Sequence, residues 1–464
     1  MIEHPCITQD PEIRAAYAAD VSGLSHIPDA VARPESEAEV ADLLHLCADR
    51  RIAVTAQGLR SSTTGASVAF RGIVLSLEKL HRVLDIDPAR RRAVAEPGVV
   101  TAEFKRQVAA AGLFYPPDPT SEEESTLGGN VACNASGSRT YRYGPTRRYV
   151  RGLRIVLAGG RITHVARIGA NKNAAGYFGL QNPIDLWIGS EGTLGIITQL
   201  EVDLIEAPPA FFGAMAFFRD WRDAIGFVLR SDASRRRGEL DPRCLEFFGE
   251  HALNLAAPAA ERLRIPANAR AAIFFEEEVA PEAIDGALER WHRAIEDAGG
   301  LADETVIART TAEQAALRAL RHAVPSTMQE RGLAAAAGGG RRVSTDFAVP
   351  LHQLPTLMEE AFQLMETHFG GPTVAYGHVG NGHPHFNLLA EDPPSLQRAE
   401  ETARRMAEVA MRLGGTLSAE HGIGKVKTHF YRDLYPEWML SAMRGVKRAL
   451  DPRGILAPGN LLDD

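Results

Sequence analysis

The stretch PPDPTSEEESTLGGNVACNASG, residues 116–137, restricts the fold of this chain more than any other. Its glycine pair, Gly128-Gly129, lets the backbone approach a ligand closely, because glycine has no Cβ. Asn130, Asn134 and Ser136 carry side chains that can hydrogen-bond an extended polar cofactor. The stretch therefore predicts a segment that lies along a bound cofactor.

Two other segments rich in small residues flank it in the sequence. TAQGLRSSTTG, residues 55–65, follows a β-prone stretch. Its glycines, hydroxyls and closely spaced amides can hold a pyrophosphate. It is neither GxGxxG nor followed by a helix of the Rossmann kind, so by itself it fits an ordinary polar loop equally well. The third segment is IGSEGTLGII, residues 188–197, a turn followed by a strand.

The surrounding pattern is that of an α+β domain. Ser36 followed by Glu39 is the signature of a capping box, and the helix that it opens has an apolar stripe of Val40, Leu43, Leu44 and Cys47. We expect strands at residues 52–55, 72–77, 92–96, 153–157, 162–165 and 195–204, and a helix at 102–111.

After Ala207 the pattern changes to longer helices. We expect helices at residues 282–298, 311–322 and 397–413, and strands at 272–276 and 345–349. The economical division is a cofactor-binding domain at 1–207 and a second α+β domain at 208–412. A C-terminal segment at 413–464 would complete the active site and pack back on the first domain.

Composition argues against several classes of protein. The 464 residues, 45% hydrophobic and 24% charged, are typical of a globular chain, and the formal charge of −8 disfavours nucleic-acid binding. The four cysteines are scattered singly, which disfavours a disulfide framework and cysteine-bound metals. The N-terminus does not resemble a signal peptide, and apolar runs of about 18 residues do not occur. We therefore expect a cytoplasmic protein without a transmembrane segment.

Two segments of the C-terminal half carry candidate metal ligands. GPTVAYGHVGNGHPHFNLL, residues 371–389, has two apolar runs joined by Gly-Asn-Gly. It predicts a hairpin that brings His378 and His385 together. In TLSAEHGIGK, residues 416–425, Glu420 would complete a set of two histidines and one carboxylate, and His421 could act as a general base. The spacing alone also fits residues that bind no metal.

Taken in order, the three segments rich in small residues resemble those of the FAD-linked oxidases of the vanillyl-alcohol oxidase and p-cresol methylhydroxylase type. The resemblance implies FAD in a domain of two α+β subdomains, followed by a substrate or cap domain with an antiparallel sheet and flanking helices. We expect the FAD to be bound non-covalently, because no obvious histidine or cysteine stands where covalent attachment would need one. The resemblance assigns the following cofactor contacts: Gln57, Gly58, Ser61 and Ser62 in the pyrophosphate loop; Pro119, Thr126, Gly129, Asn130, Asn134, Ser136 and Gly137 along the cofactor; Glu191 and Ile196 in the turn and strand that close over it. Arg60 and Ser62 stand where many members have glycine.

The histidine motifs resemble those of one branch, the D-lactate, D-2-hydroxyglutarate and glycolate dehydrogenases. This implies that His378, His385 and Glu420 bind a divalent metal, zinc or manganese. It also implies that His421 takes the hydroxyl proton while hydride leaves for flavin N5. His383 competes with His385 in this assignment, the alternative being a solvated histidine in the turn.

Further positions concern the substrate and the flavin. Arg321, in the family's L-R pattern, is the candidate that holds the substrate carboxylate, the alternative being an arginine on a helix surface. Ser344 stands where the hydroxyglutarate enzymes have lysine, which favours a substrate with one carboxylate. Ala457 stands where members usually have asparagine, so Asn460 is the nearest polar candidate for a flavin contact.

The expected activity is therefore oxidation of a D-2-hydroxy acid to the 2-oxo acid. The expected partners are this small substrate and an electron acceptor, which could be a quinone, an electron-transfer flavoprotein, a cytochrome or oxygen. A homodimer is the assembly to consider. Two alternatives stay open: a flavin-bearing subunit of a larger electron-transfer complex and a metallohydrolase.

Overall fold

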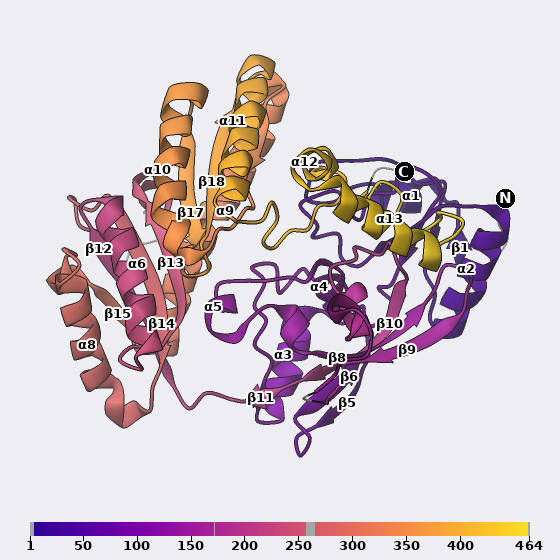
Figure 1. Cartoon of the computed structure of the whole chain (residues 1–464), viewed down its shortest axis with the longest axis horizontal. Helices are drawn as coiled ribbons and strands as arrows, with labels where there is room; N and C mark the ends of the chain where they lie inside the picture. The colour runs from indigo at the N-terminus through magenta and orange to yellow at the C-terminus, as the bar shows by residue number, and fades with distance from the viewer. Residues whose placement is uncertain (1–3, 171, 257–264, 463–464) are drawn as a thin grey trace. The chain divides into compact units, whose positions relative to one another are not determined.

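The computed structural model describes residues 4–170, 172–256 and 265–462, and the chain forms two compact units. Unit 1 comprises residues 1–136, 144–207 and 420–464, and unit 2 comprises residues 137–143 and 208–419. Helices α12 (Thr428–Leu434) and α13 (Glu437–Leu450), yellow in Figure 1, therefore belong with the indigo N-terminal segments. The division expected from the sequence placed residues 137–143 in the first domain and 413–419 in the C-terminal segment.

Unit 1 is built on two main sheets. The first has the order β1-β2-β4-β3, with β2 and β3 parallel to β4, and the second has the antiparallel order β5-β6-β10-β8-β9. The strands are β1 (Ile7–Thr8), β2 (Ala30–Ala32), β3 (Val54–Gln57), β4 (Ile73–Ser76), β5 (Val83–Asp87), β6 (Arg92–Ala95), β8 (Val150–Val156), β9 (Ile162–Ala166) and β10 (Ile196–Asp203). The short strands β7 (Leu113–Phe114) and β11 (Ile205–Glu206) form a separate pair. These sheets correspond to the two expected α+β subdomains.

Helix α2 (Glu37–Arg50) shows how the local sequence sets the core of the first sheet. Ser36 is its N-cap, and the Ser36 hydroxyl accepts the Glu39 N–H at 3.2 Å. Only half of the predicted capping box forms, because the Glu39 carboxylate accepts the Glu35 N–H at 2.7 Å. The predicted apolar stripe is buried: Val40, Leu43, Leu44 and Cys47. The other helices of unit 1 before α12 are α1 (Pro11–Ala16), α3 (Thr101–Ala110) and α4 (Leu127–Cys133).

Unit 2 is built on one seven-stranded sheet, β15-β12-β14-β13-β17-β18-β16, which is antiparallel throughout as expected. Its strands are β12 (Phe211–Phe218), β13 (Pro242–Gly249), β14 (Ala271–Glu278), β15 (Val306–Ala308), β16 (Arg341–Ser344), β17 (Thr373–His378) and β18 (His383–Ala390). The strand predicted at residues 345–349 is wrong, since β16 ends at Ser344. The Thr345 N–H still donates to the Phe386 carbonyl of β18 at 3.0 Å, but the Asp346 carbonyl accepts the Ala419 N–H at 2.8 Å.

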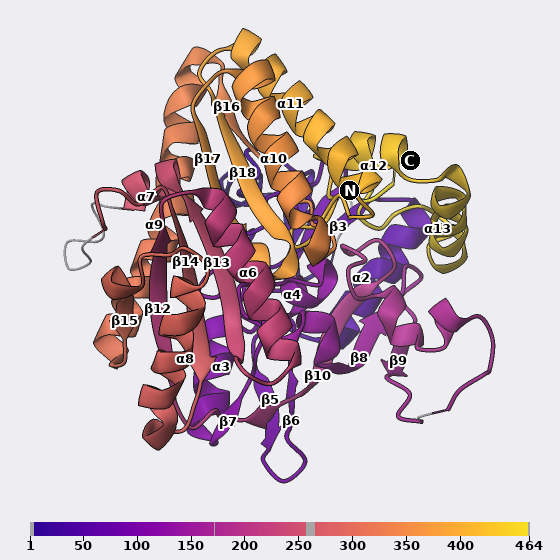
Figure 2. The ribbon, with the colours of Figure 1, turned by 60° about the vertical axis from the view of Figure 1, so that its left-hand side comes forward.

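Helices cover both faces of this sheet (Figure 2). Side chains alternate along a strand, so the neighbours Phe274 and Phe275 of β14 point to opposite faces. Phe275 stacks on Trp291 of α8 (Ile284–Glu296), whose neighbour α6 (Trp221–Arg236) also packs on β14. Phe274 joins Leu317 and Leu320 of α9 (Thr311–Ala335) in one apolar cluster with residues of α7 (Glu250–Ala256). Near β18 lie α10 (Leu354–Leu364) and α11 (Pro393–Arg412), side by side in Figure 1.

Candidate active site

Three histidines lie together on the face of the unit 2 sheet that α9 covers. Strands β17 and β18 form the predicted hairpin, in which His378 pairs with His383 and Tyr376 pairs with His385. Because paired residues share a face and side chains alternate along a strand, all three histidines point to the same side. Their ring centroids are separated by 4.4 Å (His383 and His385), 5.4 Å (His378 and His385) and 5.5 Å (His378 and His383).

His383 corrects the sequence analysis. The alternative offered there was a solvated histidine in the turn, yet His383 is only 2% exposed and is the first residue of β18. The sequence did contain a signal for this burial. Residues 383 and 385 are two positions apart on one strand, so their side chains point to the same face of the sheet. The hairpin thus supplies three imidazoles where two were expected.

Glu420 belongs to the same group of candidate metal ligands. One ligand atom from each of four residues lies within 4.8 Å of the others: His378, His383, His385 and Glu420. The boundary between the two units falls immediately before Glu420, and the residues that precede it are fixed to unit 2. The Ala419 N–H donates to the Asp346 carbonyl at 2.8 Å, and the Ser418 hydroxyl donates to the Asp346 carboxylate at 2.7 Å.

The imidazoles differ in the nitrogen that orients them. His378 Nδ1 lies 2.7 Å from Glu246 Oε1, and His385 Nδ1 lies 3.2 Å from the Thr345 carbonyl oxygen. A histidine that donates from Nδ1 to a carboxylate or carbonyl coordinates a metal through Nε2. His383 differs, because its Nε2 lies 3.2 Å from Asp346 Oδ1, an ion-pair distance without hydrogen-bond geometry. The donor set of His378, His385 and Glu420 therefore fits a divalent ion such as zinc or manganese.

Glu246 of β13 connects the histidines to α9. Its carboxylate, 3% exposed, also accepts a hydrogen bond from Arg321 Nε at 2.9 Å. Burial alone would raise the pKa of Glu246, but the charges of His378 and Arg321 outweigh burial and lower it to about 2. Arg321 is thus held beside the histidines, with Nη2 at 3.5 Å from His378 Nδ1. Glu246 was not among the residues expected from the sequence, although a lone glutamate in the apolar stretch CLEFFG was a signal for it.

In unit 1 the three segments rich in small residues contact one another. Gly58 approaches Thr126 so closely that a Cβ on residue 58 would lie 2.5 Å from Thr126 Oγ1. The Gly189 N–H donates to the Val131 carbonyl, and the Glu191 N–H donates to the Ala132 carbonyl, both at 2.9 Å. The segments that the resemblance assigns to one cofactor therefore form one contiguous group.

The loop at residues 57–67 is held by its own side chains. Gln57 Nε2 donates to the Tyr17 and Ser67 carbonyls at 3.1 and 2.6 Å. Ser62 Oγ accepts the N–H groups of residues 64 and 66 at 3.3 and 3.2 Å. Arg60 has φ +64, which explains why glycine is usual at this position, and its guanidinium lies 5.0 Å from the Tyr17 ring centroid.

Part of the stretch at residues 116–137 is helical, which sequence analysis did not predict. Thr126 caps α4, and its hydroxyl accepts the Gly129 N–H at 3.2 Å. Asn130 Nδ2 donates to Thr101 Oγ1 at 2.7 Å, and Asn134, with φ +52, ends the helix. The remaining predicted cofactor residues fall into three sets: Pro119 and Ile196 are buried, Ser61 and Ser136 are half-buried, and Gly137 begins the short segment of unit 2.

The pyrophosphate loop fits an anionic group. In the described part of the chain, the buried hydroxyl of Thr63 and the buried Oε1 of Gln57 have no hydrogen-bond partner. Buried polar groups are normally bonded, because an unsatisfied one costs free energy. The Thr63 hydroxyl thus provides a donor for a phosphate oxygen at the position where the resemblance places one.

The segment after Glu420 packs on this loop within unit 1. Thr64 Oγ1 donates to the His421 carbonyl at 3.2 Å, and the Thr64 carbonyl accepts the N–H groups of Lys425 and Val426 at 2.9 and 3.1 Å. The His421 side chain is 32% exposed, and its Nε2 lies 4.0 Å from Glu420 Oε2. His421 is thus a partly accessible imidazole on a fixed backbone, as a general base requires.

Profile comparison identifies two domains in this chain. The FAD binding domain matches residues 28–166, and the C-terminal domain of FAD linked oxidases matches residues 208–461. The chain belongs to the FAD-linked oxidases. This membership confirms FAD as the cofactor and an oxidoreductase as the class of enzyme.

Relatives of this FAD-linked oxidase are named as hydroxy-acid dehydrogenases and oxidases. It is 30% identical over 458 residues to the glycolate oxidase subunit GlcD of Bacillus subtilis, covering 97% of this chain and 92% of that protein. It is 29% identical over 450 residues to a D-2-hydroxyglutarate dehydrogenase of Xanthomonas citri, and the match covers 94% of this chain and 89% of that protein. It is 30% identical over 447 residues to a probable mitochondrial D-lactate dehydrogenase of Danio rerio, covering 94% and 84%.

Solved structures confirm the fold of the FAD-linked oxidase. p-Cresol methylhydroxylase with substrate bound aligns with a TM-score of 0.73 at 15% identity, covering 99% of this chain and 94% of that one. Alkyldihydroxyacetonephosphate synthase aligns with a TM-score of 0.73 at 20% identity, and the match covers 98% of this chain and 84% of that one. The expected fold type, that of p-cresol methylhydroxylase, is therefore confirmed.

The C-terminal tail of the FAD-linked oxidase is held by protein contacts. Asn460 Nδ2 donates to the Ala66 and Glu191 carbonyls at 2.8 and 3.1 Å, and its Oδ1 accepts from Lys425 Nζ at 2.5 Å. The flavin contact expected of Asn460 stays a prediction. Ala457 has φ +41, a left-handed conformation that asparagine tolerates better than alanine, which accounts for the asparagine usual in the family.

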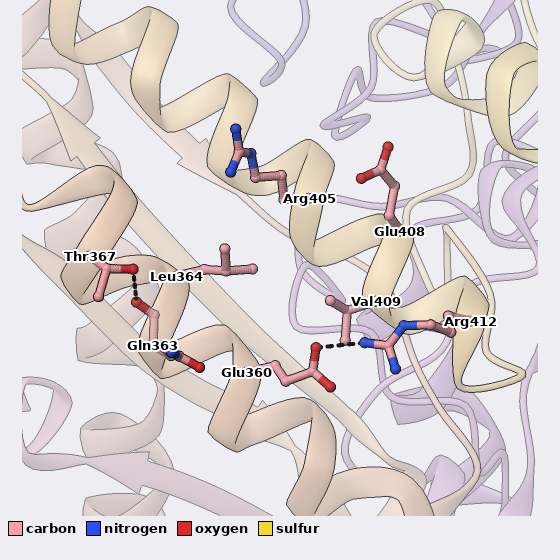
Figure 3. A pocket seen from close by; sticks show the side chains of 8 residues that line it. All are labelled: Glu360, Gln363, Leu364, Thr367, Arg405, Glu408, Val409 and Arg412. Carbon is pink, nitrogen blue, oxygen red and sulfur yellow. Dashed lines mark hydrogen bonds and ion pairs between the residues drawn. The ribbon is translucent and has the colours of Figure 1, made fainter.

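A groove between α10 and α11 is lined by none of the predicted site residues (Figure 3). Its lining is Glu360, Gln363, Leu364, Thr367, Arg405, Glu408, Val409 and Arg412. Arg412 pairs with Glu360 at 2.5 Å, and Arg405 pairs with Glu401 of the same helix at 3.0 Å. Since its arginines are paired with neighbouring carboxylates, we assign no ligand to this groove.

Proposed function

We propose that this FAD-linked oxidase oxidises a D-2-hydroxy acid to the 2-oxo acid with the help of a divalent metal ion. The observation that carries the proposal is the group formed by His378, His385 and Glu420, in which Nδ1 of both imidazoles is held by an oxygen atom. The names of the relatives, which include glycolate, D-lactate and D-2-hydroxyglutarate enzymes, support the same substrate class.

Each residue has one role in the proposal. His378, His385 and Glu420 hold the ion, which when bound lowers the pKa of a coordinated hydroxyl. His421 takes the proton of that hydroxyl, since imidazole exchanges protons near neutral pH. The pair of electrons of the C–H bond leaves as hydride for FAD, and the C–O bond becomes a carbonyl. Proton and hydride together account for the two electrons and two hydrogens removed.

Arg321 is the proposed clamp for the substrate carboxylate. A guanidinium carries five N–H donors in one plane and suits a carboxylate better than an ammonium group does. Glu246 holds this guanidinium through Nε at 2.9 Å, which fixes it beside His378 of the proposed metal group. Ser344 stands where a lysine would recognise a second carboxylate of the substrate. Its presence therefore favours a substrate with a single carboxylate. Arg341, three residues before Ser344, pairs with Glu400 at 2.5 Å, so we do not assign it the role of that lysine.

The reduced flavin must pass its electrons to an external acceptor, which we propose to be a quinone, an electron-transfer flavoprotein, a cytochrome or oxygen. One relative is named a subunit, so a second candidate is a flavin-bearing subunit of a larger electron-transfer complex. Membership of the FAD-linked oxidases removes the metallohydrolase alternative. Among the described residues, the helices are all too short or too polar to cross a bilayer.

Anaerobic flavin reduction tests the proposal. FAD-loaded protein is mixed with glycolate and with the D- and L-forms of lactate and 2-hydroxyglutarate, and bleaching of the flavin absorbance is followed before and after chelation. A short D-hydroxy acid should bleach the flavin, chelation should slow the reaction, and added zinc or manganese should restore it. The proposal fails if none of these acids bleaches the flavin or if protein verified as metal-free reacts at the same rate. Reduction of the isolated chain would also exclude an inert subunit.

A further inference from the structure

Glu191 lies where four segments of unit 1 meet. It occupies the turn before β10 with φ +50 and is 6% exposed. Its N–H donates to the Ala132 carbonyl at 2.9 Å, and its carbonyl accepts from Asn460 Nδ2 at 3.1 Å. Contacts to α4 and to the C-terminal tail therefore hold its backbone in a conformation that L-residues rarely adopt.

The carboxylate of Glu191 binds the backbone that follows Glu420 and His421. Oε1 accepts the Ile423 N–H at 2.7 Å, and Oε2 accepts the Gly424 N–H at 2.8 Å. Gly422 has φ +74, and a Cβ there would lie 2.4 Å from Oε1. The chain thus passes so close to the carboxylate that residue 422 has room for glycine alone.

The same loop has other anchors in unit 1. Gly424 has φ +53, and a Cβ there would lie 2.2 Å from the Thr64 carbonyl oxygen. The Gly424 carbonyl accepts the Leu461 N–H at 3.2 Å. Glu191 is the side chain that binds two consecutive amides of this loop, and each of its oxygens takes one of them.

We propose that Glu191 is a positioning residue whose carboxylate sets the backbone path of residues 421–424. It thereby fixes where Glu420 presents its ligand oxygen and where His421 presents its imidazole. The inference rests on the function proposed above for these two residues, and it differs from the cofactor contact that the family resemblance implies for Glu191. A carboxylate is required because a carboxamide has one acceptor oxygen and would direct its own N–H groups at the second amide.

Three variants test this role in the full-length FAD-loaded protein. E191Q keeps the shape of the side chain but removes one acceptor, and E191D keeps both acceptors on a shorter side chain. S190A is the matched control, because Ser190 is also 6% exposed in the same turn and its hydroxyl donates to the Trp187 carbonyl at 2.9 Å. Flavin content and thermal melting are recorded for each variant.

The first readout is hydrogen exchange of the peptide that contains residues 420–427, measured by mass spectrometry. E191Q should raise the exchange rate of the Ile423 and Gly424 amides about tenfold, because one amide loses its acceptor. S190A should leave the rate unchanged, and E191D should fall between them. This readout requires neither metal nor turnover.

The second readout is affinity for zinc, measured by competition with a chromogenic chelator. E191Q should bind zinc about 10–100-fold more weakly, as is typical when a group that orients a metal ligand is removed. It should retain FAD, and excess zinc should restore part of the flavin reduction.

The outcomes separate the inference from the proposed function. Unchanged amide exchange in E191Q overturns the inference, and so does raised exchange with unchanged zinc affinity. Loss of FAD with unchanged exchange also overturns it and assigns Glu191 to the cofactor. If the unsubstituted protein binds neither zinc nor manganese, the proposed function fails, and the exchange rates still decide whether Glu191 fixes the loop. If E191Q does not fold, the same measurements on E191D decide.

Discussion

Replacing Glu246 with glutamine should destabilise unit 2 although the two side chains have nearly the same shape. The Glu246 carboxylate is buried between Arg321 Nε at 2.9 Å and His378 Nδ1 at 2.7 Å. E246Q removes its negative charge, whereas Arg321, 13% exposed, keeps its positive charge because a guanidinium does not lose its proton in proteins. The variant therefore removes the negative charge that lies 2.9 Å from this largely buried cation.

The pKa of Glu246 sets the size of the effect. It is lowered from 4.5 to about 2. Because one pKa unit corresponds to about 1.4 kcal/mol, the ionised carboxylate contributes about 3 kcal/mol to the free energy of unfolding at neutral pH. Removing one partner of a buried ion pair costs a similar amount, about 3–5 kcal/mol. Melting of a domain of roughly 150–250 residues shifts by about 2–4 °C per kcal/mol, so E246Q should melt about 6–12 °C lower.

The same pKa predicts how the difference depends on pH. A carboxyl group whose pKa is lowered by folding stabilises the protein above its ordinary pKa, and this stability is lost as the pH falls through the lowered value. The difference in stability between the unsubstituted protein and E246Q should therefore have its full size above about pH 4.5 and should shrink as the pH falls toward about 2.

E277Q on the neighbouring strand is the matched control. Glu277 is also buried and accepts a hydrogen bond from the Trp291 indole, but burial raises its pKa above the ordinary value. A neutral carboxamide should therefore be tolerated there, with melting within about 2 °C of the unsubstituted protein. Both variants are melted after chelation and followed by circular dichroism. Equal losses in the two variants, or no loss in E246Q, would refute the reasoning.

Three other substitutions test particular contacts. G58A should lower the flavin content of the purified protein, because its Cβ would lie 2.5 Å from a threonine hydroxyl, whereas G159A has open space and should retain FAD; equal flavin contents would contradict this. H421N should keep FAD but reduce it at least about 100-fold more slowly, since the general base is gone, and normal reduction would exclude that role. H385A should lose more zinc affinity than H383A, because the Thr345 carbonyl orients His385 for coordination through Nε2, whereas His383 Nε2 faces Asp346 Oδ1 at 3.2 Å; equal losses in a chelator competition would make His383 a ligand.

Local features of the structure could be predicted where a few neighbouring residues control them. The N-cap of α2 depends on Ser36, and the hairpin of β17 and β18 depends on the Gly-Asn-Gly turn between the two apolar runs. The family could be identified for the same reason, since its motifs require particular residue types at short spacing.

The wrong predictions have physical causes outside such local windows. The strand expected at residues 345–349 does not form because, after the Thr345 N–H has bonded to Phe386 of β18, the Asp346 carbonyl bonds to residue 419 and Ala348 bonds to Thr416. Helix α9 continues to Ala335, past the expected end at residue 322, although Pro325 lies within it. The burial of Leu320 and Met328 in one apolar cluster stabilises this longer helix, and local helix propensity does not report that contribution.

The sequence by itself determined the family and the cofactor, because their motifs act over a few positions, and it named most residues of the candidate site as predictions. Tertiary structure decided how these residues are held. It placed Glu246 on Arg321, 75 positions away, and Glu191 on the Ile423 amide, 232 positions away. Such contacts depend on strand register and on burial, and the pKa of a buried carboxyl group depends on the charges that the fold brings near it. A short stretch of sequence determines neither the strand register nor the burial of a side chain.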